Sequence, residues 1–298
     1  MAGTASSKHS DLSLRARLGD GLGLVAAHAQ AALLMAASFA LLNLFFVKLA
    51  VMIAPDYAAY LKTPPGPPGA RAGGHVLLDL MVQTFSVMNL LGHAVIWARI
   101  CLLGEGRALA GGLDAFLRRF SVCLSRLLVG GFMSVLFALP AIMVGAILVA
   151  VLRGLLGVYG NTVGSAAMLV MVLIPVGAVA AALILSVIAE AADRRLSMLN
   201  AIRQTQPAWT RLAVIMLVLS AVYAVAATAV AVAAGDGRVA AGEGVTGAGA
   251  FLVRDALGFL TLATAVGGLA PLLRDKKKRP DGGADQNNEP WADDDPSP

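Results

Sequence analysis

Residues 190–220, EAADRRLSMLNAIRQTQPAWTRLAVIMLVLS, join a basic stretch with apolar residues at helical spacing directly to a long apolar run. The same construction occurs in EGRALAGGLDAFLRRFSVCLSRLLVGGFMSVLF (105–137) and, more faintly, in LSLRARLGDGLGLVAAHAQAALLMAASFALLNL (12–44). Each copy leads into a pair of long apolar runs. The sequence therefore predicts an all-α, polytopic membrane protein. Its three parallel repeats would each hold an amphipathic surface helix and two spans, at about 11–104, 105–190 and 191–273.

The composition supports a membrane protein, because 58% of the residues are apolar and only 14% are charged. A helix needs about 20 apolar residues to cross the hydrocarbon core of a bilayer. Six transmembrane helices are predicted on this basis, at 29–53, 75–98, 127–152, 165–189, 212–234 and 250–273. The polar ends, 1–10 and 274–298, are predicted to be disordered, which leaves 11–273 as the membrane domain.

The distribution of basic residues predicts the orientation, since short loops rich in Lys and Arg remain in the cytoplasm. With six spans, one side carries 17 Lys and Arg residues and the other side carries five. Both termini, including the tail at 274–298, are therefore expected in the cytoplasm. Abundant Arg and Ala are typical of bacteria, which predicts a multi-pass protein of the bacterial inner membrane. Cys101 and Cys123 fall on the cytoplasmic side and are expected to be free thiols.

The basic residues of the surface helices and of the segment after the last span are predicted to contact lipid headgroups. They are Arg118, Arg119, Arg194, Arg195, Lys276, Lys277 and Lys278. Anionic lipids of the cytoplasmic leaflet are thus the predicted partners, with a membrane-protein partner or a second copy of the chain as further alternatives. The positive net charge does not indicate nucleic acid, because the basic residues lie where the topology requires them.

The second predicted span carries a polar stripe. Its members share one helical face: His75, Asp79, Gln83, Ser86, His93 and Trp97, with Asn89 beside them. Interhelical hydrogen bonding is one interpretation, and it is favoured because such bonds are common in helix bundles. The alternative is that the stripe lines a cavity or a solute path.

An ion pair is predicted between the first two spans. Lys48 and Asp79 are expected at matching depths of consecutive antiparallel helices, and a lone charge in hydrocarbon is costly. The alternative is that Lys48 extends its side chain to the outer surface. The candidate intramembrane polar site therefore comprises Lys48, Asp79, Gln83, Asn89 and His93.

Glu190, the segment Ala201-Ile-Arg-Gln-Thr205 and Trp209 carry a resemblance to a known family. The layout of spans and this region resemble a bacterial family of six-span proteins that includes the membrane domain attached to some glycerophosphoryl diester phosphodiesterases. The glycine that usually follows the acidic residue in that family is missing here. The resemblance implies an envelope protein that handles lipid or stabilises another membrane component. Because the sequence shows no phosphodiesterase domain, that activity is not expected.

No catalytic constellation is visible in the sequence, so we expect a protein that is not an enzyme, with no catalytic residues, metal or cofactor. Two functions remain. A scaffold or assembly partner that maintains the envelope fits the apolar spans. A transporter or binding module for a small solute or lipid would use the polar face of the second span. The scaffold is favoured, because the third to fifth spans carry almost no polar groups that could complete a solute path.

Overall fold

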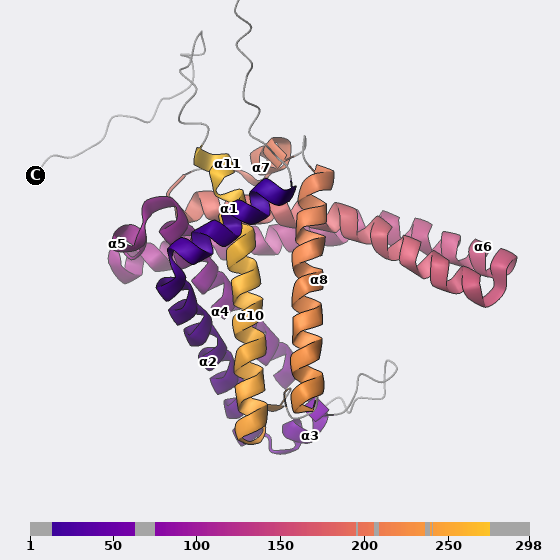
Figure 1. Ribbon diagram of the computed structural model, residues 1–298, viewed down its shortest axis with the longest axis horizontal. Coiled ribbons are helices and arrows are strands. Elements are labelled where there is room, and N and C mark those ends of the chain that lie inside the picture. Colours follow the sequence, from indigo (N-terminus) through magenta and orange to yellow (C-terminus); the bar gives the residue numbers. More distant parts are fainter. Residues whose placement is uncertain are drawn as a thin grey trace, which may run out of the picture.

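The computed structural model describes residues 14–62, 75–194, 196–205, 209–235, 239 and 241–274, and the regular elements within them are helices. Four long helices form a bundle: α2 (Ala29–Ile53), α4 (Val76–Leu103), α8 (Trp209–Ala234) and α10 (Gly244–Leu269). In Figure 1, α10 lies between α2 and α8, and it also packs against α4. The predicted helices at 29–53, 75–98, 212–234 and 250–273 are thus confirmed, since long apolar segments satisfy their backbone polar groups by forming helices.

The third and fourth predicted spans form one element, α6 (Gly112–Ala191), which folds back on itself at Gly157. Gly157 has φ +60°, a backbone conformation that glycine adopts without strain. The two arms run antiparallel, because a Cβ added to Gly130 would meet Leu183, and one added to Gly164 would meet Val149. Figure 1 shows this hairpin crossing one end of the bundle and projecting sideways from it, whereas the other long helices run alongside one another.

Five helices in the described residues are long and apolar enough to cross a membrane. They are Ala29–Ile53, Val76–Leu103, Gly112–Leu155, Thr210–Ala234 and Gly244–Leu273. The second arm of α6 contributes a shorter apolar helix, Pro175–Ala191, where the sequence predicts a full span at 165–189. The structure therefore shows a multi-pass architecture. The sixth span and the threefold repeat remain predictions, and the hairpin of the second predicted repeat is placed differently from the other two.

The short helices divide between the two ends of the bundle. Figure 1 places α1 (Leu14–Ala27), α7 (Met198–Thr205) and α11 (Pro271–Arg274) at one end, which we call the α1 end. It places α3 (Asp56–Lys62) at the other end, which we call the α3 end. The predicted disorder at 1–10 and in the tail after Arg274 concerns residues outside the described ranges.

The first two predicted surface helices do not lie apart from the long helices: the first packs against one of them and the second is continuous with another. α1 packs across α10, where Gly21 approaches the backbone of Thr264. The second surface helix is the short α5 (Glu105–Ala108) followed by the first turns of α6, which continue into the apolar arm without a break. Gly21 permits the close contact between α1 and α10, because small residues let two helix backbones approach each other.

Gly21→Ala should therefore destabilise the protein. The new Cβ would clash with the Thr264 carbonyl, which cannot move aside as a flexible side chain would, and we expect a loss of about 1–3 kcal/mol. Gly23→Ala on the same helix is the matched control, because its added Cβ would meet no atom within 4 Å apart from the neighbouring backbone of its own helix. There the better helix propensity of Ala should raise the stability by up to about 1 kcal/mol. Thermal unfolding in detergent measures both changes, and equal shifts in the two variants would contradict this packing.

A buried arginine, Arg99, connects several helices at the α1 end through hydrogen bonds and an ion pair. Arg99, whose side chain is 4% exposed, donates from Nε to Ala108 O at 2.7 Å and from Nη1 to Ala191 O at 2.7 Å. Its Nη1 also lies 3.0 Å from Asp193 Oδ2. Arg119 binds the same carboxylate, with Nε 2.7 Å from Asp193 Oδ1, and this hydrogen bond lowers the pKa of Asp193. One carboxylate thus joins the end of α4 to both arms of α6.

The arginines predicted to contact lipid headgroups have different surroundings in the structure. Arg119 binds Asp193, and Arg194 donates to the carbonyl of Leu273, so both guanidinium groups have protein partners. Arg118 is exposed, and its contact with lipid remains a prediction. Arg195 and residues 276–278 lie outside the described residues.

Candidate functional site: two adjoining polar cavities

The polar stripe of the second predicted span divides into two halves with different surroundings. In the half towards the α1 end, His93 Nε2 is hydrogen-bonded to Ser38 Oγ at 2.8 Å. Asn89 donates from Nδ2 to Phe39 O at 3.0 Å, and Trp97 donates from Nε1 to Ala263 O at 3.0 Å. These side chains bind α4 to α2 and α10, as the packing interpretation predicts.

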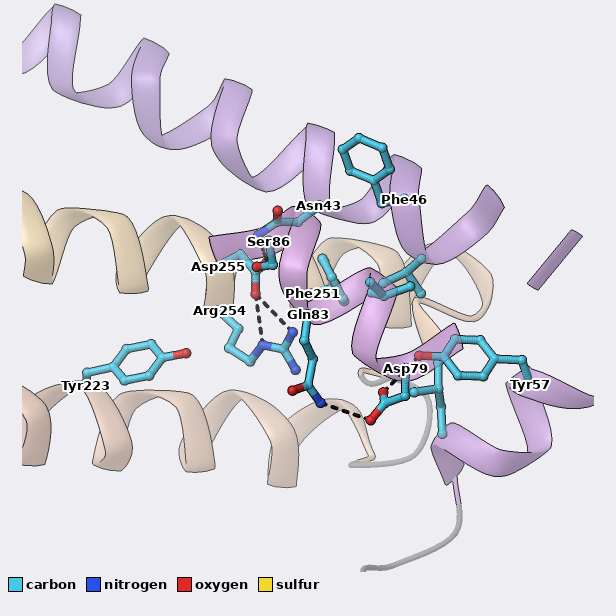
Figure 2. A pocket seen from close by; sticks show the side chains of 13 residues that line it. Asn43, Phe46, Tyr57, Asp79, Gln83, Ser86, Tyr223, Phe251, Arg254 and Asp255 are labelled. Carbon is cyan, nitrogen blue, oxygen red and sulfur yellow. Dashed lines mark hydrogen bonds and ion pairs between the residues drawn. The ribbon is translucent and has the colours of Figure 1, made fainter. Parts of the chain in front are cut away.

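The half of the stripe towards the α3 end lines a cavity, as the alternative interpretation predicts. The α3-side cavity has a volume of about 420 Å³ and is bordered by Asp79, Gln83 and Ser86 of α4. Figure 2 shows its other polar lining residues: Asn43 from α2, Tyr57 from α3, Tyr223 from α8, and Arg254 and Asp255 from α10. Polar side chains from four long helices therefore converge on one space.

A second cavity, which we call the central cavity, adjoins the first. It has a volume of about 370 Å³ and shares Asn43, Ser86, Tyr223 and Asp255 with the α3-side cavity. The rest of its wall is more apolar and includes Ile184 from the second arm of α6. The two cavities lie within the size range of small-molecule sites.

Arg254 and Asp255 form a charge pair inside the bundle. Arg254 Nη2 lies 2.9 Å from Asp255 Oδ1, and Asn43 donates from Nδ2 to Asp255 Oδ2 at 2.8 Å. Asn89 in turn donates from Nδ2 to Asn43 Oδ1 at 2.9 Å. The Asp255 carboxylate is thus held by a cation and an amide, as a charge within a membrane span requires.

Asp79 has a different environment at the edge of the α3-side cavity. Tyr57 donates its hydroxyl to Asp79 Oδ1 at 3.0 Å, and Gln83 donates from Nε2 to Oδ2 at 2.9 Å (Figure 2). Burial, followed by the hydrogen bond to this carboxylate, raises the pKa of Tyr57. The phenol therefore stays protonated and acts as a donor to Asp79.

The predicted ion pair between Lys48 and Asp79 is wrong. Lys48 donates from Nζ to Ala241 O at 3.2 Å, and its side chain points to the segment that precedes α10. Position along the helix does not determine the direction in which a side chain leaves it, and this direction decides whether two charges meet. Of the predicted site, the structure brings Asp79 and Gln83 to the cavity. It places Asn89 and His93 in the hydrogen-bonded half of the stripe.

Sequence reasoning missed Arg254 and Asp255 as site residues. The predicted span at 250–273 places them near its beginning, and they were not assigned a role. The helix begins at Gly244, however, so the pair lies ten residues inside α10. The sequence alone could have identified this pair, because charged residues within a candidate membrane span indicate a functional site by default.

The cysteines and other potential metal ligands do not form an additional site in the described residues. Cys101 and Cys123 are thiols that form no disulfide, as predicted, and they are 1% and 0% exposed. No group of three or more His, Cys, Asp or Glu side chains in the described ranges could hold a metal ion.

Two of the residues that carry the family resemblance, Glu190 and Thr205, make contacts within the chain. Glu190 Oε2 lies 2.6 Å from Arg126 Nη2, which joins the two arms of α6. The Thr205 hydroxyl donates to Ala201 O at 3.0 Å within α7. Comparison with protein-family models, curated proteins and solved structures found no match for this chain.

Proposed function

We propose that this chain is a multi-pass membrane protein that binds a small solute in the α3-side and central cavities. The observation that carries the proposal is the convergence of polar groups from α2, α4, α8 and α10 on one space. The sequence favoured a scaffold because the third to fifth predicted spans offered almost no polar groups, and the fifth of these is α8. Ser220 and Tyr223 of that span nevertheless line the central cavity, and α10 adds the charge pair.

The orientation predicted from the basic residues forms part of the proposal. The α1 end would face the cytoplasm and the α3 end would face the outside of a bacterial inner membrane. Six spans in three repeats would follow if the hairpin of α6 inserts as two spans. The proposed solute would then enter from the outer side, where Tyr57 and Asp79 border the α3-side cavity.

Cysteine labelling tests whether the cavity is open to water from that side. Ser86→Cys places a thiol where the two cavities meet, so a membrane-impermeant, cationic methanethiosulfonate added outside intact cells should modify it. Val87→Cys is the matched control, since Val87 is exposed on a wholly apolar surface that would face hydrocarbon, and hydrocarbon excludes a charged reagent. The wild type supplies the blank, because both native cysteines are buried. An unmodified Ser86→Cys, or equal labelling of the two variants, would overturn the proposal.

A scaffold remains the second candidate function, and the surface of the α6 hairpin favours it. Leu128, Phe132, Met143 and Ile147 are each at least 65% exposed. Such a surface must be covered by lipid or by a protein partner. Mild-detergent purification followed by mass spectrometry of proteins and lipids distinguishes the two, because a scaffold should retain a stoichiometric protein partner.

A further inference from the structure

The Asp79 carboxylate is the one charge on the wall of the α3-side cavity that has no counter-ion in the described part of the chain. Its two hydrogen-bond donors, Tyr57 and Gln83, are neutral. The other charges that line this cavity, Arg254 and Asp255, neutralise each other. The nearby Lys62 is paired with Glu243, at 2.6 Å between Nζ and Oε2. The cavity wall therefore carries a net negative charge that resides at Asp79.

Four aromatic rings line the same cavity as this carboxylate, and Tyr57 lies directly beside it (Figure 2). Phe46, Tyr57, Tyr223 and Phe251 all line the α3-side cavity. One of these rings already accepts a cation, since the Arg254 guanidinium carbon lies 4.7 Å from the centroid of Phe251. Aromatic faces attract ammonium and guanidinium groups, and they do so most strongly where water is excluded.

We propose that the α3-side cavity binds an organic cation, an ammonium or a guanidinium, with Asp79 as its counter-ion. This inference rests on the proposed function and names the class of its solute. The aromatic rings would surround the apolar part of the cation, and Gln83 would hold the carboxylate in place. An anion is disfavoured because the single arginine of the wall is paired with Asp255. A metal ion is disfavoured because Asp79 is the only carboxylate that the wall leaves unpaired.

Choline and its neutral isostere 3,3-dimethylbutan-1-ol provide the test, because they have nearly the same shape and differ in charge. Isothermal titration of the purified full chain in detergent should show that the isostere binds at least about tenfold more weakly. Asp79→Asn should abolish this preference while leaving the affinity for the isostere unchanged. Asp114→Asn is the matched control, since Asp114 is exposed at the start of α6, and it should retain the preference.

Several outcomes would overturn the cation proposal, and they differ from failure of the cavity itself. Equal binding of both compounds, a preference that persists in Asp79→Asn, or preferential binding of an anion such as acetate would overturn it. So would the absence of binding by either compound. If Ser86→Cys is labelled as expected, the water-accessible cavity remains in each of these cases. The comparison on the wild type alone decides the matter if Asp79→Asn does not fold.

The same chemistry could belong to a free solute or to a lipid headgroup, and nanodiscs separate these sources. Discs of phosphatidylcholine should compete with added choline if the headgroup occupies the cavity, whereas discs of phosphatidylglycerol should not. Equal choline affinity in the two discs would assign the site to a free cation. Both results support an organic cation as the ligand.

Discussion

Arg99→Met should lower the free energy of unfolding by about 2–5 kcal/mol, because it removes a buried guanidinium that is the hydrogen-bond donor to two main-chain carbonyls. The variant leaves the carbonyls of Ala108 and Ala191 without their donor, and each unsatisfied buried polar group is costly. Because Asp193 keeps Arg119 as a partner, the loss should lie at the lower end of this range. Such a loss is a large fraction of the stability of a typical folded protein.

Arg118→Met is the matched control for this prediction, because Arg118 is exposed on the same end of the molecule. Its effect should stay within about 0.5 kcal/mol, as for other surface substitutions. Denaturant or thermal unfolding in detergent measures both variants, and similar unfolding curves would show that the Arg99 cluster does not stabilise the protein.

The dependence of the wild type's stability on pH provides a second measurement of the same cluster. Since the folded-state pKa of Asp193 is lowered, its contribution is complete above the unfolded pKa of about 4 and is lost as the pH falls through the folded value.

The long helices could be predicted because hydrophobic length alone determines them. α2 spans Ala29–Ile53, which coincides with the predicted 29–53, and α8 begins three residues before the predicted 212. In a bilayer, a continuous apolar segment has few alternatives to a helix that satisfies its own backbone. The placement of the α6 hairpin could not be predicted in this way, since two apolar arms joined by Gly157 can have the same local structure in several orientations.

The contacts of the polar groups were less predictable, because they depend on how each helix is rotated about its axis. Asp79, Gln83 and Ser86 could be assigned to one face of one helix from their spacing. Asn43, Tyr223 and Asp255 lie on three other helices, and no periodicity within any of these helices indicates that they meet. The Arg99–Asp193 pair joins residues 94 positions apart, so its partner was equally hidden.

The start of α10 illustrates a further limit. Half of residues 244–249, GVTGAG, are glycines, and glycine has low intrinsic helix propensity. The sequence therefore favoured a later start for the last span. Packing overrides this propensity, since Gly247 and Phe251 are buried in the structure and extend the helix towards the α3 end. That extension places Arg254 and Asp255 inside the helix rather than at its beginning.

Asp255→Asn should destabilise the protein strongly, because it leaves the Arg254 cation without a counter-ion inside a span. A lone charge at such a position costs at least about 2.5 kcal/mol on insertion scales. Arg254→Gln should also destabilise, since Asp255 would then retain only the amide of Asn43. The double variant carries neither charge, so it should lose less than the sum of the two single variants, with a coupling of about 0.5–3 kcal/mol.

The Lys48 and Asp79 pair provides the control cycle, because the sequence and the structure give opposite expectations for it. An ion pair would make Lys48→Gln and Asp79→Asn non-additive, whereas in the structure the two side chains bind different partners. We therefore expect additivity within about 0.5 kcal/mol for this cycle and coupling for Arg254 with Asp255. Thermal unfolding of the wild type and of the three variants in each cycle, seven proteins in all, measures both couplings. The reverse pattern would show that Asp79 is neutralised by Lys48, which would remove the unpaired carboxylate on which cation binding depends.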